Sequence, residues 1–493
     1  MQASIIPCPD NPALSLLQRI LFCSLLWANQ PLWALGLPPE IEASLAAVKV
    51  PGDAISVLVA EAQGGTPARL SHRANVALNP ASVMKLVTTY AALDLLGPAF
   101  TWSTQVFVDG NVHDGTLHGN LIIKGHGDPK LVVERLWLLL RRVQGLGIRA
   151  IAGDIVLDRS AFETVVQDPA EFDGEPLRPY NAAPDALLVN YKSVVMTFVP
   201  DAANRLARVQ FEPPLSGVQT QATVVLSAGE CNDYRSSLKA DFSDPARIRF
   251  AGRYPLKCGE RIWPVAYADP ASYSVRAVAA MWREAGGKLS GKVREGKVPA
   301  DLKPAFELIS PALAEVIRDI NKYSNNVMAQ QVFLTLGLRA GRRPDAGAAV
   351  ATMAGAREVV NVWWTDRIAP GAGANNIDAP ALDNGSGLSR DGRISAQALA
   401  LLLQTAYRSP VMSELMASLP VSGVDGTLRR SQSETPGRAH LKTGSLRGVS
   451  AVAGYVDGAS GRRYVLVAIV NHANAQAARP AIDALIDWTV RDE

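Results

Sequence analysis

The spacing of apolar residues changes along the chain, and this pattern predicts a mixed α+β protein. Apolar runs of strand length are found at 54–60, 449–456 and 464–470. Such runs, rich in Val and Ile and bounded by turn residues, are typical of β-strands. Elsewhere apolar residues recur three and four positions apart, which predicts buried helices at 83–93, 310–323, 396–405 and 482–490. Ser310-Pro311 predicts where the second of these helices begins.

The middle of the chain has a different character. Strands are predicted at 101–108, 117–124 and 153–157, with helices at 131–143 and 273–285. Between them, roughly from 190 to 262, short β segments alternate with Pro, Gly and Asp breaks. This stretch predicts a small separate β module. A chain of 493 residues exceeds one compact core, so two or three domains are expected.

The first residues predict an export signal. Arg19 is followed by an apolar stretch over residues 20–28 and by small residues at 34–36. This order is typical of a cleaved signal peptide, which we place at 1–36 with cleavage near Ala34 to Gly36. An uncleaved anchor or a buried first helix are the alternatives. The sequence therefore predicts an exported protein; the family resemblance described below implies that it is periplasmic, in the cell envelope.

Cysteine usage agrees with export. Cys8 and Cys23 fall in the leader, which leaves Cys231 and Cys258 in the mature chain. An even pair within one segment predicts a single disulfide in an oxidising compartment, although two unrelated buried thiols would also explain it. No Cys-x-x-Cys pair is present in the sequence, which argues against a zinc or redox site.

Composition narrows the function further. The chain is 48% hydrophobic and 19% charged, with a net charge of +3 and no long Lys/Arg run, so nucleic-acid binding has little support. We expect neither a metal nor another cofactor. The C-terminus is not a basic amphipathic helix, which predicts at most loose membrane association. The sequence leaves a homodimer open.

The candidate chemistry begins at Ser82, which stands three positions before Lys85 at the start of an apolar helix. On a helix the two side chains lie one turn apart on the same face. A serine hydroxyl needs a base to become a nucleophile, and a desolvated lysine amine can serve as one. The Ser-x-x-Lys pattern is common by chance, and a second copy occurs at 236–239 in a polar segment. We interpret that second copy as an accident of surface composition.

Two further motifs make the Ser82-x-x-Lys85 motif credible. Ser324-x-Asn326 follows a predicted helix, and Lys442-Thr443-Gly444 lies in a predicted strand; each is found once in the chain. Taken separately, each motif has a simple structural explanation: Ser324 could lie in a helix-ending loop, Lys442 could be an exposed lysine of an edge strand, and Ser82 could cap a helix. In this order and on these elements, the three motifs are the signature of penicillin-binding proteins and serine β-lactamases.

Each residue then has a chemical task. Ser82 would attack an acyl carbonyl, Lys85 would accept its proton, and Ser324 would pass a proton to the leaving amine. Asn326 would hydrogen-bond the substrate backbone. A terminal carboxylate would be met by Lys442 and Thr443. Gly444 would leave room for substrate beside the strand, and the backbone N–H groups of Ser82 and Ser445 would form an oxyanion hole.

The chain resembles one family in particular: the class C penicillin-binding proteins of low molecular mass, of the D-alanyl-D-alanine carboxypeptidase/endopeptidase type (peptidase family S13, penicillin-binding protein 4 group). Ser324 follows Ser82 by 242 residues (324 minus 82), far more than in β-lactamases, and the family is known for domains inserted there. Further matching segments are 79–82, 125–129, 153–155, 180–182, 322–326, 383–389, 422–428 and 440–446.

The resemblance implies a fold and a domain plan. Residues 37–98 and 306–493 would form a penicillin-recognising domain, an antiparallel sheet flanked by helices whose edge strand carries Lys442. Residues 99–190 and 263–305 would form an inserted α/β domain, and 191–262 the β module. The family is metal-free and removes the terminal D-alanine of peptidoglycan stem peptides or cuts their cross-links, and β-lactam antibiotics acylate it.

The resemblance leaves one site residue and the exact reaction open. In the family, a carboxylate of the inserted region recognises the amine of the third stem-peptide residue. Here the segment 171–175 departs from the expected pattern, and Glu175 or Asp173 are the candidates. A serine D,D-peptidase is the leading hypothesis. A serine β-lactamase or a catalytically silent peptidoglycan-binding protein are the alternatives.

Overall fold

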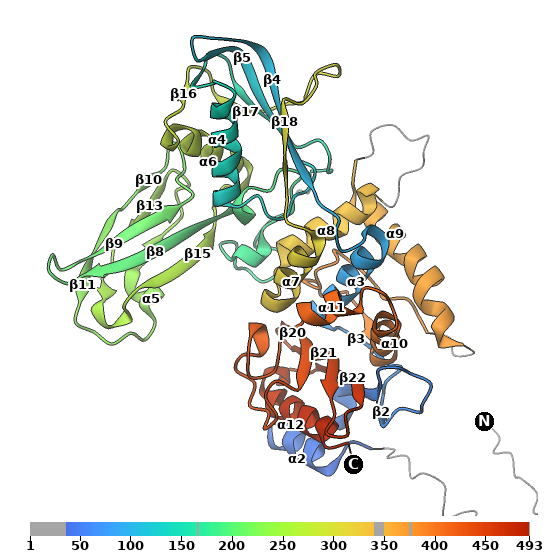
Figure 1. The fold of residues 1–493 in the computed structure, drawn as a ribbon. Helices are drawn as coiled ribbons and strands as arrows, with labels where there is room; N and C mark the ends of the chain where they lie inside the picture. The colour runs from blue at the N-terminus through green and yellow to red at the C-terminus, as the bar shows by residue number, and fades with distance from the viewer. Residues whose placement is uncertain (1–35, 165–166, 340–349, 374–376, 493) are drawn as a thin grey trace, which may run out of the picture.

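The structure is a computed structural model that describes residues 36–164, 167–339, 350–373 and 377–492. Its ribbon has a lower body built from both ends of the chain and an upper part built from the middle (Figure 1). The predicted signal peptide lies almost entirely outside the described residues, which begin at Gly36. No helix in these described ranges is both long enough and apolar enough to cross a membrane.

The lower body contains a five-stranded antiparallel sheet in the order β2-β1-β22-β21-β20. Its strands come from opposite ends of the sequence: β1 Ile55–Glu61, β2 Leu70–His72, β20 Ala439–Leu446, β21 Val449–Asp457 and β22 Arg463–Asn471. Because β1 pairs with β22 over seven residues, the two ends of the chain close one domain around the inserted middle.

Both faces of this sheet are buried, which explains the continuous apolar runs in its sequence. In β22, Val465, Val467 and Ile469 point to one core, while Leu466, Ala468 and Val470 point to the other. The first core is covered by α3 Lys85–Leu96, α7 Leu313–Tyr323, α8 Asn326–Arg339, α9 Met353–Trp363, α10 Ala396–Tyr407 and α11 Met412–Ser418. The second is covered by α2 Pro39–Ala47 and α12 Arg479–Val490. The α+β class predicted from sequence is confirmed.

The upper part contains a second sheet. Its strands run in the order β16-β6-β5-β4-β18, and β7 pairs with both β5 and β17. Their bounds are β4 Ser103–His113, β5 Thr116–Lys124, β6 Ala150–Ile151, β7 Ile155–Asp158, β16 Lys288–Leu289, β17 Val293–Glu295 and β18 Phe306–Ile309. Two helices pack beside it, α4 Val133–Gly145 and α6 Pro270–Glu284.

The segment entering α7 departs from the sequence prediction. Strand β18 pairs with β4, so residues 306–309 belong to the inserted sheet rather than to the catalytic domain. The helix begins at Leu313, not at Ser310-Pro311. Ser310 is used otherwise, because its Oγ accepts the N–H of Trp102 at 2.9 Å and so joins β18 to the segment before β4.

The β module contains a five-stranded sheet in the order β14-β11-β9-β8-β15 and a small sheet β10-β13-β12. Its elements are β8 Ser193–Asp201, β9 Leu206–Glu212, β10 Gln219–Thr220, β11 Thr223–Ser227, α5 Tyr234–Leu238, β12 Ala240–Asp241, β13 Arg247–Phe250, β14 Tyr254–Pro255 and β15 Arg261–Ala266. Strand β15 pairs with β8 along its whole length, so the module continues four residues beyond the predicted end at 262.

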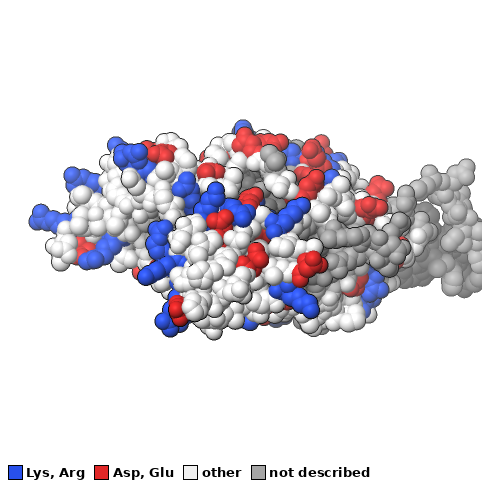
Figure 2. Space-filling model, turned by 90° about the horizontal axis from the view of Figure 1, so that it is seen from above, with Lys and Arg blue, Asp and Glu red and all other residues white. Residues whose placement is uncertain are grey.

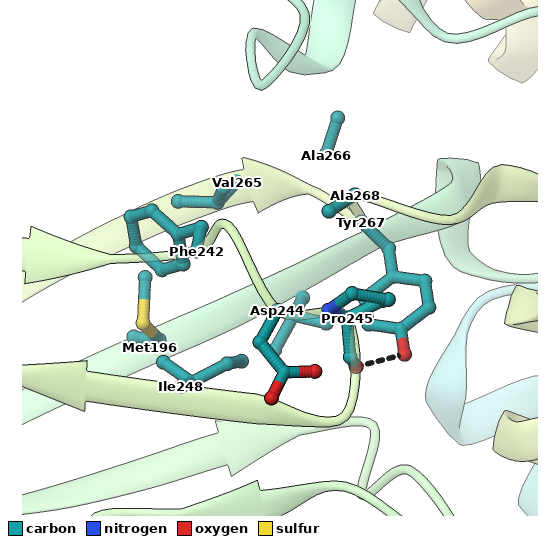
Figure 3. A pocket seen from close by; sticks show the side chains of 10 residues that line it. Met196, Phe242, Asp244, Pro245, Ile248, Val265, Ala266, Tyr267 and Ala268 are labelled. Carbon is teal, nitrogen blue, oxygen red and sulfur yellow. Dashed lines mark hydrogen bonds between the residues drawn. The ribbon is translucent and has the colours of Figure 1, made fainter.

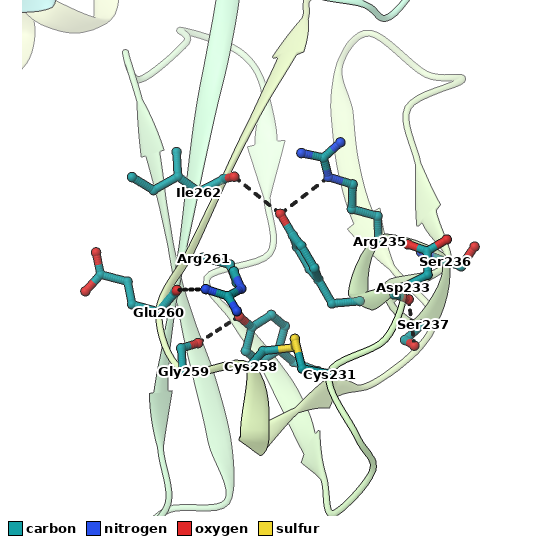
Figure 4. The surroundings of a disulfide bond; sticks show 12 residues. Cys231, Asp233, Arg235, Ser236, Ser237, Cys258, Gly259, Glu260, Arg261 and Ile262 are labelled. Atoms are coloured by element: carbon teal, nitrogen blue, oxygen red, sulfur yellow. Dashed lines mark hydrogen bonds between the residues drawn. A yellow bond between two sulfur atoms is a disulfide. The ribbon is translucent and has the colours of Figure 1, made fainter. Parts of the chain in front are cut away.

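A disulfide joins Cys231 to Cys258 within this module, as the cysteine pattern predicts (Figure 4). The small cavity in Figure 3, lined by apolar side chains such as Met196, Phe242 and Val265, also lies in the module. Its volume of about 20 Å³ is close to that of one water-sized probe, so it is a packing defect and not a ligand site.

Candidate active site

Ser82 lies in a 3₁₀ turn, Ala81–Met84, immediately before α3. The turn is held by Asn79, whose Oδ1 accepts the Ala81 N–H at 2.8 Å and whose Nδ2 donates to the Ser389 carbonyl at 2.9 Å. Ala81 has φ +48°, a backbone conformation that costs energy for a residue with a Cβ. Asn79 therefore fixes a strained turn that presents the Ser82 hydroxyl one turn ahead of Lys85.

The Lys85 side chain is completely buried, and its amine makes three hydrogen bonds. Its Nζ donates to Ser82 Oγ at 2.8 Å, to Asn326 Oδ1 at 2.6 Å and to the backbone carbonyl of Ser386 at 2.6 Å. Burial lowers the pKa of Lys85 well below its usual range, and the positive charge of Lys442 lowers this pKa further. Three donated hydrogen bonds describe the ammonium form. Once neutral, the amine can keep its N–H bonds to Asn326 and Ser386 and turn its lone pair to the Ser82 hydroxyl, so that it can act as a general base. Sequence reasoning did not identify the Ser386 carbonyl as its third partner.

Ser324 and Lys442 form a second hydroxyl–amine pair. Ser324 caps the C-terminus of α7 with φ +58°, and its Oγ accepts a hydrogen bond from Lys442 Nζ at 2.9 Å. Lys442 also donates to the Thr443 carbonyl at 2.7 Å and is completely buried. Burial lowers the pKa of Lys442 to about 7. Near neutral pH this amine can therefore either carry a positive charge or lose a proton.

Asn326, the first residue of α8, links Lys85 to the segment that contains Tyr180. Its Oδ1 accepts from Lys85, and its Nδ2 donates to the Tyr180 carbonyl at 3.3 Å. One N–H of the amide is left for another acceptor. Asn326 is predicted to bond substrate, and in the structure it also joins Lys85 to the backbone of Tyr180.

Strand β20 carries Lys442, Thr443, Gly444 and Ser445 at the end of the sheet order. Residues 420–422 cover the first part of its free edge, because Leu441 N–H donates to the Pro420 carbonyl and Ser422 N–H to the Ala439 carbonyl. The segment 443–446 lies beyond that cover. An extended peptide can add to such an edge through main-chain hydrogen bonds.

Close packing against the turn that carries Ser82 also requires a glycine at position 444. A Cβ on Gly444 would lie 2.3 Å from the Pro80 carbonyl oxygen and 3.1 Å from the Val83 nitrogen. Real Cβ atoms do not approach backbone atoms this closely. The glycine therefore lets the edge strand contact the turn that carries Ser82, in addition to leaving space for substrate.

Two adjoining pockets open at the paired hydroxyls. The larger, about 640 Å³, is lined by Ser82, Ser324, Asn326 and Ser445 of the catalytic domain. The inserted region contributes Phe172, Asp173 and Tyr180 to the same pocket. A second pocket of about 330 Å³ also contains Ser82 and Ser324 and extends along Thr427, Thr443 and Gly444. An acyl group and its leaving group can therefore occupy opposite sides of Ser82.

Of the two candidate carboxylates, Asp173 lines the larger pocket and Glu175 does not. Asp173 accepts hydrogen bonds from the Tyr180 hydroxyl and from Asn181 Nδ2, both at 2.8 Å. Burial acts to raise the pKa of Asp173, but these two hydrogen bonds outweigh it and the pKa is lowered. Glu175 is exposed and faces Arg178, with Oε2 to Nε at 3.4 Å.

Arg390 lines the same pocket as Asp173. Its guanidinium lies 4.7 Å from the Phe172 ring centroid, which connects the catalytic domain to the inserted region across the pocket. Its Nη1 donates to the Arg447 carbonyl at 3.1 Å. Sequence reasoning did not single out Arg390. The one signal for it was that Arg390 directly follows the matching segment 383–389.

The comparisons with known proteins agree with this architecture. The model of the D-Ala-D-Ala carboxypeptidase 3 (S13) family matches residues 37–491, nearly the whole described chain. The chain therefore belongs to this family and is a serine-type carboxypeptidase.

Relatives named in the same terms match at low identity over most of their length. The D-alanyl-D-alanine carboxypeptidase of Actinomadura sp. (strain R39) is 29% identical over 435 residues, which are 83% of this chain and 76% of that protein. The D-alanyl-D-alanine carboxypeptidase DacB of Haemophilus influenzae is 25% identical over 403 residues, 79% of this chain and 80% of that protein.

Solved structures support the fold. The crystal structure of penicillin-binding protein 4 (dacB) from Haemophilus influenzae matches with a TM-score of 0.68 at 22% identity, covering 91% of this chain and 100% of that one. A predatory endopeptidase from Bdellovibrio bacteriovorus, Bd3459, matches with a TM-score of 0.52 at 14% identity, over 88% of this chain and 92% of that one.

Proposed function

We propose that this chain cleaves the terminal D-Ala-D-Ala bond of peptidoglycan stem peptides, or cross-links that end in a D-D bond, through an acyl-enzyme on Ser82. The observation that carries the proposal is the 2.8 Å hydrogen bond from the buried Lys85 amine to Ser82 Oγ. The pair opens into the same pockets as the Ser324–Lys442 pair. Two buried amines, each on a hydroxyl, can move protons at both sides of one scissile bond.

Acylation follows from these positions. Neutral Lys85 takes the proton of Ser82 Oγ as the oxygen attacks the carbonyl carbon of the penultimate D-alanine. The carbonyl oxygen gains negative charge beside the backbone N–H groups of Ser82 and Ser445. The C–N bond then breaks, and the Ser324 hydroxyl gives a proton to the departing amine while Lys442 replaces it. Hydrolysis of the ester by water returns Ser82 to its free form.

The second pocket suits the departing D-alanine. Its carboxylate would face protonated Lys442 and the Thr443 hydroxyl, which itself bonds Thr427 Oγ1 at 2.7 Å. The larger pocket suits the rest of the stem peptide. Its lining contains both a carboxylate, Asp173, and a guanidinium, Arg390, and these two charges are complementary to a side chain that carries both an amine and a carboxylate.

The same chemistry supports two further parts of the proposal. A β-lactam presents a strained acyl group and a carboxylate, so it would acylate Ser82 and remain bound. The substrate lies outside the cytoplasm, and the Cys231–Cys258 disulfide is typical of an oxidising compartment. We therefore place the protein in the periplasm or, more broadly, in the cell envelope.

Intact-mass analysis after brief exposure to benzylpenicillin, with peptide mapping, tests the nucleophile. We expect one adduct on the Ser82 peptide and none in Ser82→Ala. Ser236→Ala is the matched control, because Ser236 begins the second Ser-x-x-Lys match and is exposed in α5. Labelling that persists in Ser82→Ala would overturn the assignment. Release of D-alanine from a D-Ala-D-Ala peptide, measured in parallel, tests the reaction itself.

A further inference from the structure

A groove of about 450 Å³ runs along α6 in the inserted part of the chain, outside both pockets at Ser82. One wall is the α6 face that carries Ser272, Val275, Arg276, Ala279 and Arg283. The other wall is formed by residues 287–293, around β16 and β17. In the ribbon, α6 and β16 lie in the upper part of the molecule, away from β20 in the lower body (Figure 1). We call this feature the α6 groove.

The α6 groove has an apolar floor and a basic rim. Val275, Trp282 and Leu289 contribute apolar surface, whereas Arg276, Arg283 and Lys292 contribute positive charge. None of the described residues that line it is Asp or Glu. Asp154 accepts the Lys292 backbone N–H, but its carboxylate is already paired with Arg294 at 2.6 Å and it is not part of the lining. The positive charge of the rim is therefore not neutralised within the groove.

Arg276 is held in a fixed orientation. Its Nε donates to Ser272 Oγ at 2.9 Å and its Nη1 to the Ser216 carbonyl at 3.0 Å, which ties α6 to a loop of the β module. These bonds leave Nη2 free to bind an anion. A guanidinium whose rotamer is already fixed loses little entropy on binding an acidic group.

The charge distribution of the chain points the same way. Residues 191–305 contain seventeen Lys and Arg against eleven Asp and Glu, an excess of six, although the whole chain has a net charge of only +3. Seen from above, Lys and Arg side chains prevail over the half of the surface that carries the β module (Figure 2). The excess is confined to the β module and the segment with α6, because residues 99–190 contain eight Lys and Arg against twelve Asp and Glu.

We propose that the α6 groove is an accessory binding site for free carboxylates on a peptidoglycan strand, at a position away from the peptide being cleaved. This inference rests on the proposed function, because it assumes that the substrate is a polymer with many acidic stem peptides. Basic rim residues would steer the polymer to the enzyme and hold it while Ser82 reacts with successive peptides. The apolar floor would contact the uncharged faces of the sugars or peptides.

Co-sedimentation with purified peptidoglycan sacculi tests the proposal in the full-length mature chain carrying Ser82→Ala, so that cleavage does not remove the ligand. The test variant is Arg283→Glu/Lys292→Glu, which leaves the Arg276 bridge intact. We expect its apparent affinity for sacculi to fall about tenfold or more at low salt, since two attractive charges become repulsive. The effect should shrink as salt is raised.

Three controls separate the outcomes. Arg249→Glu/Arg253→Glu makes the same charge change on exposed β-module residues outside the groove and should bind sacculi as the parent does. Sacculi whose carboxylates have been amidated should bind the parent as weakly as native sacculi bind the test variant. Benzylpenicillin labelling of the test variant with Ser82 restored reports on the catalytic domain. Unchanged binding by the test variant, or undiminished binding to amidated sacculi, would refute the accessory site. Absence of labelling in the otherwise unchanged chain with Ser82 intact would instead refute the proposed function.

Discussion

Lys322 donates to both carboxylate oxygens of Asp425, at 2.6 and 2.8 Å, across 103 residues of sequence. Lys322 lies two residues before Ser324 at the end of α7 and is nearly buried. Asp425 also accepts the Val421 N–H at 2.9 Å and precedes the 3₁₀ turn Gly426–Leu428, which carries Thr427. The pair therefore joins the helix that positions Ser324 to the turn that supports Thr443.

Asp425→Asn should reduce both stability and acylation. It leaves the Lys322 ammonium without a charged partner, at a cost of about 1–3 kcal/mol in the free energy of unfolding, because the partly exposed Asp425 lets water reach the site. The rate of acylation by benzylpenicillin should fall by roughly tenfold as Ser324 loses its fixed position.

The double variant Lys322→Met/Asp425→Asn distinguishes the two effects. It removes the unpaired Lys322 ammonium, so much of the lost free energy of unfolding should be recovered, as measured by urea denaturation. Acylation should remain slow, since the connection between α7 and the Asp425 turn is still absent. Recovery of the acylation rate together with stability would show that the ion pair does not position Ser324.

The two buried lysines predict a bell-shaped pH dependence of kcat/KM for a D-Ala-D-Ala peptide. Lys85 must be neutral to accept a proton, so activity rises with pH as this amine deprotonates; its pKa lies well below the usual range because of burial and the charge of Lys442. Lys442 must be protonated to attract the substrate carboxylate. Its pKa of about 7 predicts that activity falls again above neutral pH. The apparent values will belong to the coupled pair.

Lys442→Arg identifies the alkaline limb. A guanidinium keeps its charge through this range, so the alkaline fall should move to much higher pH or disappear. The acid limb should remain, and circular dichroism should show that the fold is retained. An alkaline limb that stays in place in this variant would assign it to another group.

The residues with chemistry were predictable from the sequence because each motif lies on a short, local element. Ser82 and Lys85 are one turn apart, and the spacing alone places them on one face. Contacts that depend on how distant loops meet were not predictable: the Ser386 carbonyl on Lys85, Arg390 on Phe172, and Asp425 on Lys322. Each joins segments whose relative placement is determined by tertiary packing.

The exact domain limits were not predictable for a related reason. Strands β15 and β18 are short segments in the sequence. Their pairing with β8 and β4 places β15 in the sheet of the β module and β18 in the upper sheet. Sequence periodicity predicts that a strand exists but not which edge it joins. The predicted division into three domains therefore stays a proposal, and the strand pairing shows which sheet the segments near residues 262 and 306 join.

Asp173→Asn and Glu175→Gln form a matched pair for the choice between the two candidate carboxylates. Only Asp173 lines the pocket, so Asp173→Asn should raise KM about tenfold for a peptide whose third residue bears a free amine. The same variant should change KM little for the N-acetylated peptide. Glu175→Gln should change neither, because its carboxylate faces Arg178 outside the pocket. The reverse pattern would assign recognition to Glu175.

Removal of the disulfide should affect the β module and spare the chemistry. The bridge closes a segment of 27 residues, and loss of such a constraint costs about 3–4 kcal/mol in the chain-entropy description. In Cys231→Ser/Cys258→Ser we expect faster amide hydrogen exchange in β8, β9 and β15. Benzylpenicillin acylation should keep its rate, since neither pocket at Ser82 contains a β-module residue among those described. A parallel loss of acylation would show that the module supports the active site.

Gly444→Ala tests whether the edge strand must contact the nucleophile turn. The new Cβ would be 2.3 Å from the Pro80 carbonyl oxygen, and this backbone atom cannot move aside as a flexible side chain could. The strand and the turn must separate, which displaces Ser82 from Lys85 and from the Ser445 N–H. Acylation should fall on the order of 100-fold, the effect expected for a misplacement of about 1 Å. Gly145→Ala, at the end of α4 where a Cβ meets no atom within 4 Å, is the matched control and should acylate normally. Normal acylation by Gly444→Ala would mean that the turn and β20 are not rigidly coupled, and that Gly444 serves substrate binding alone.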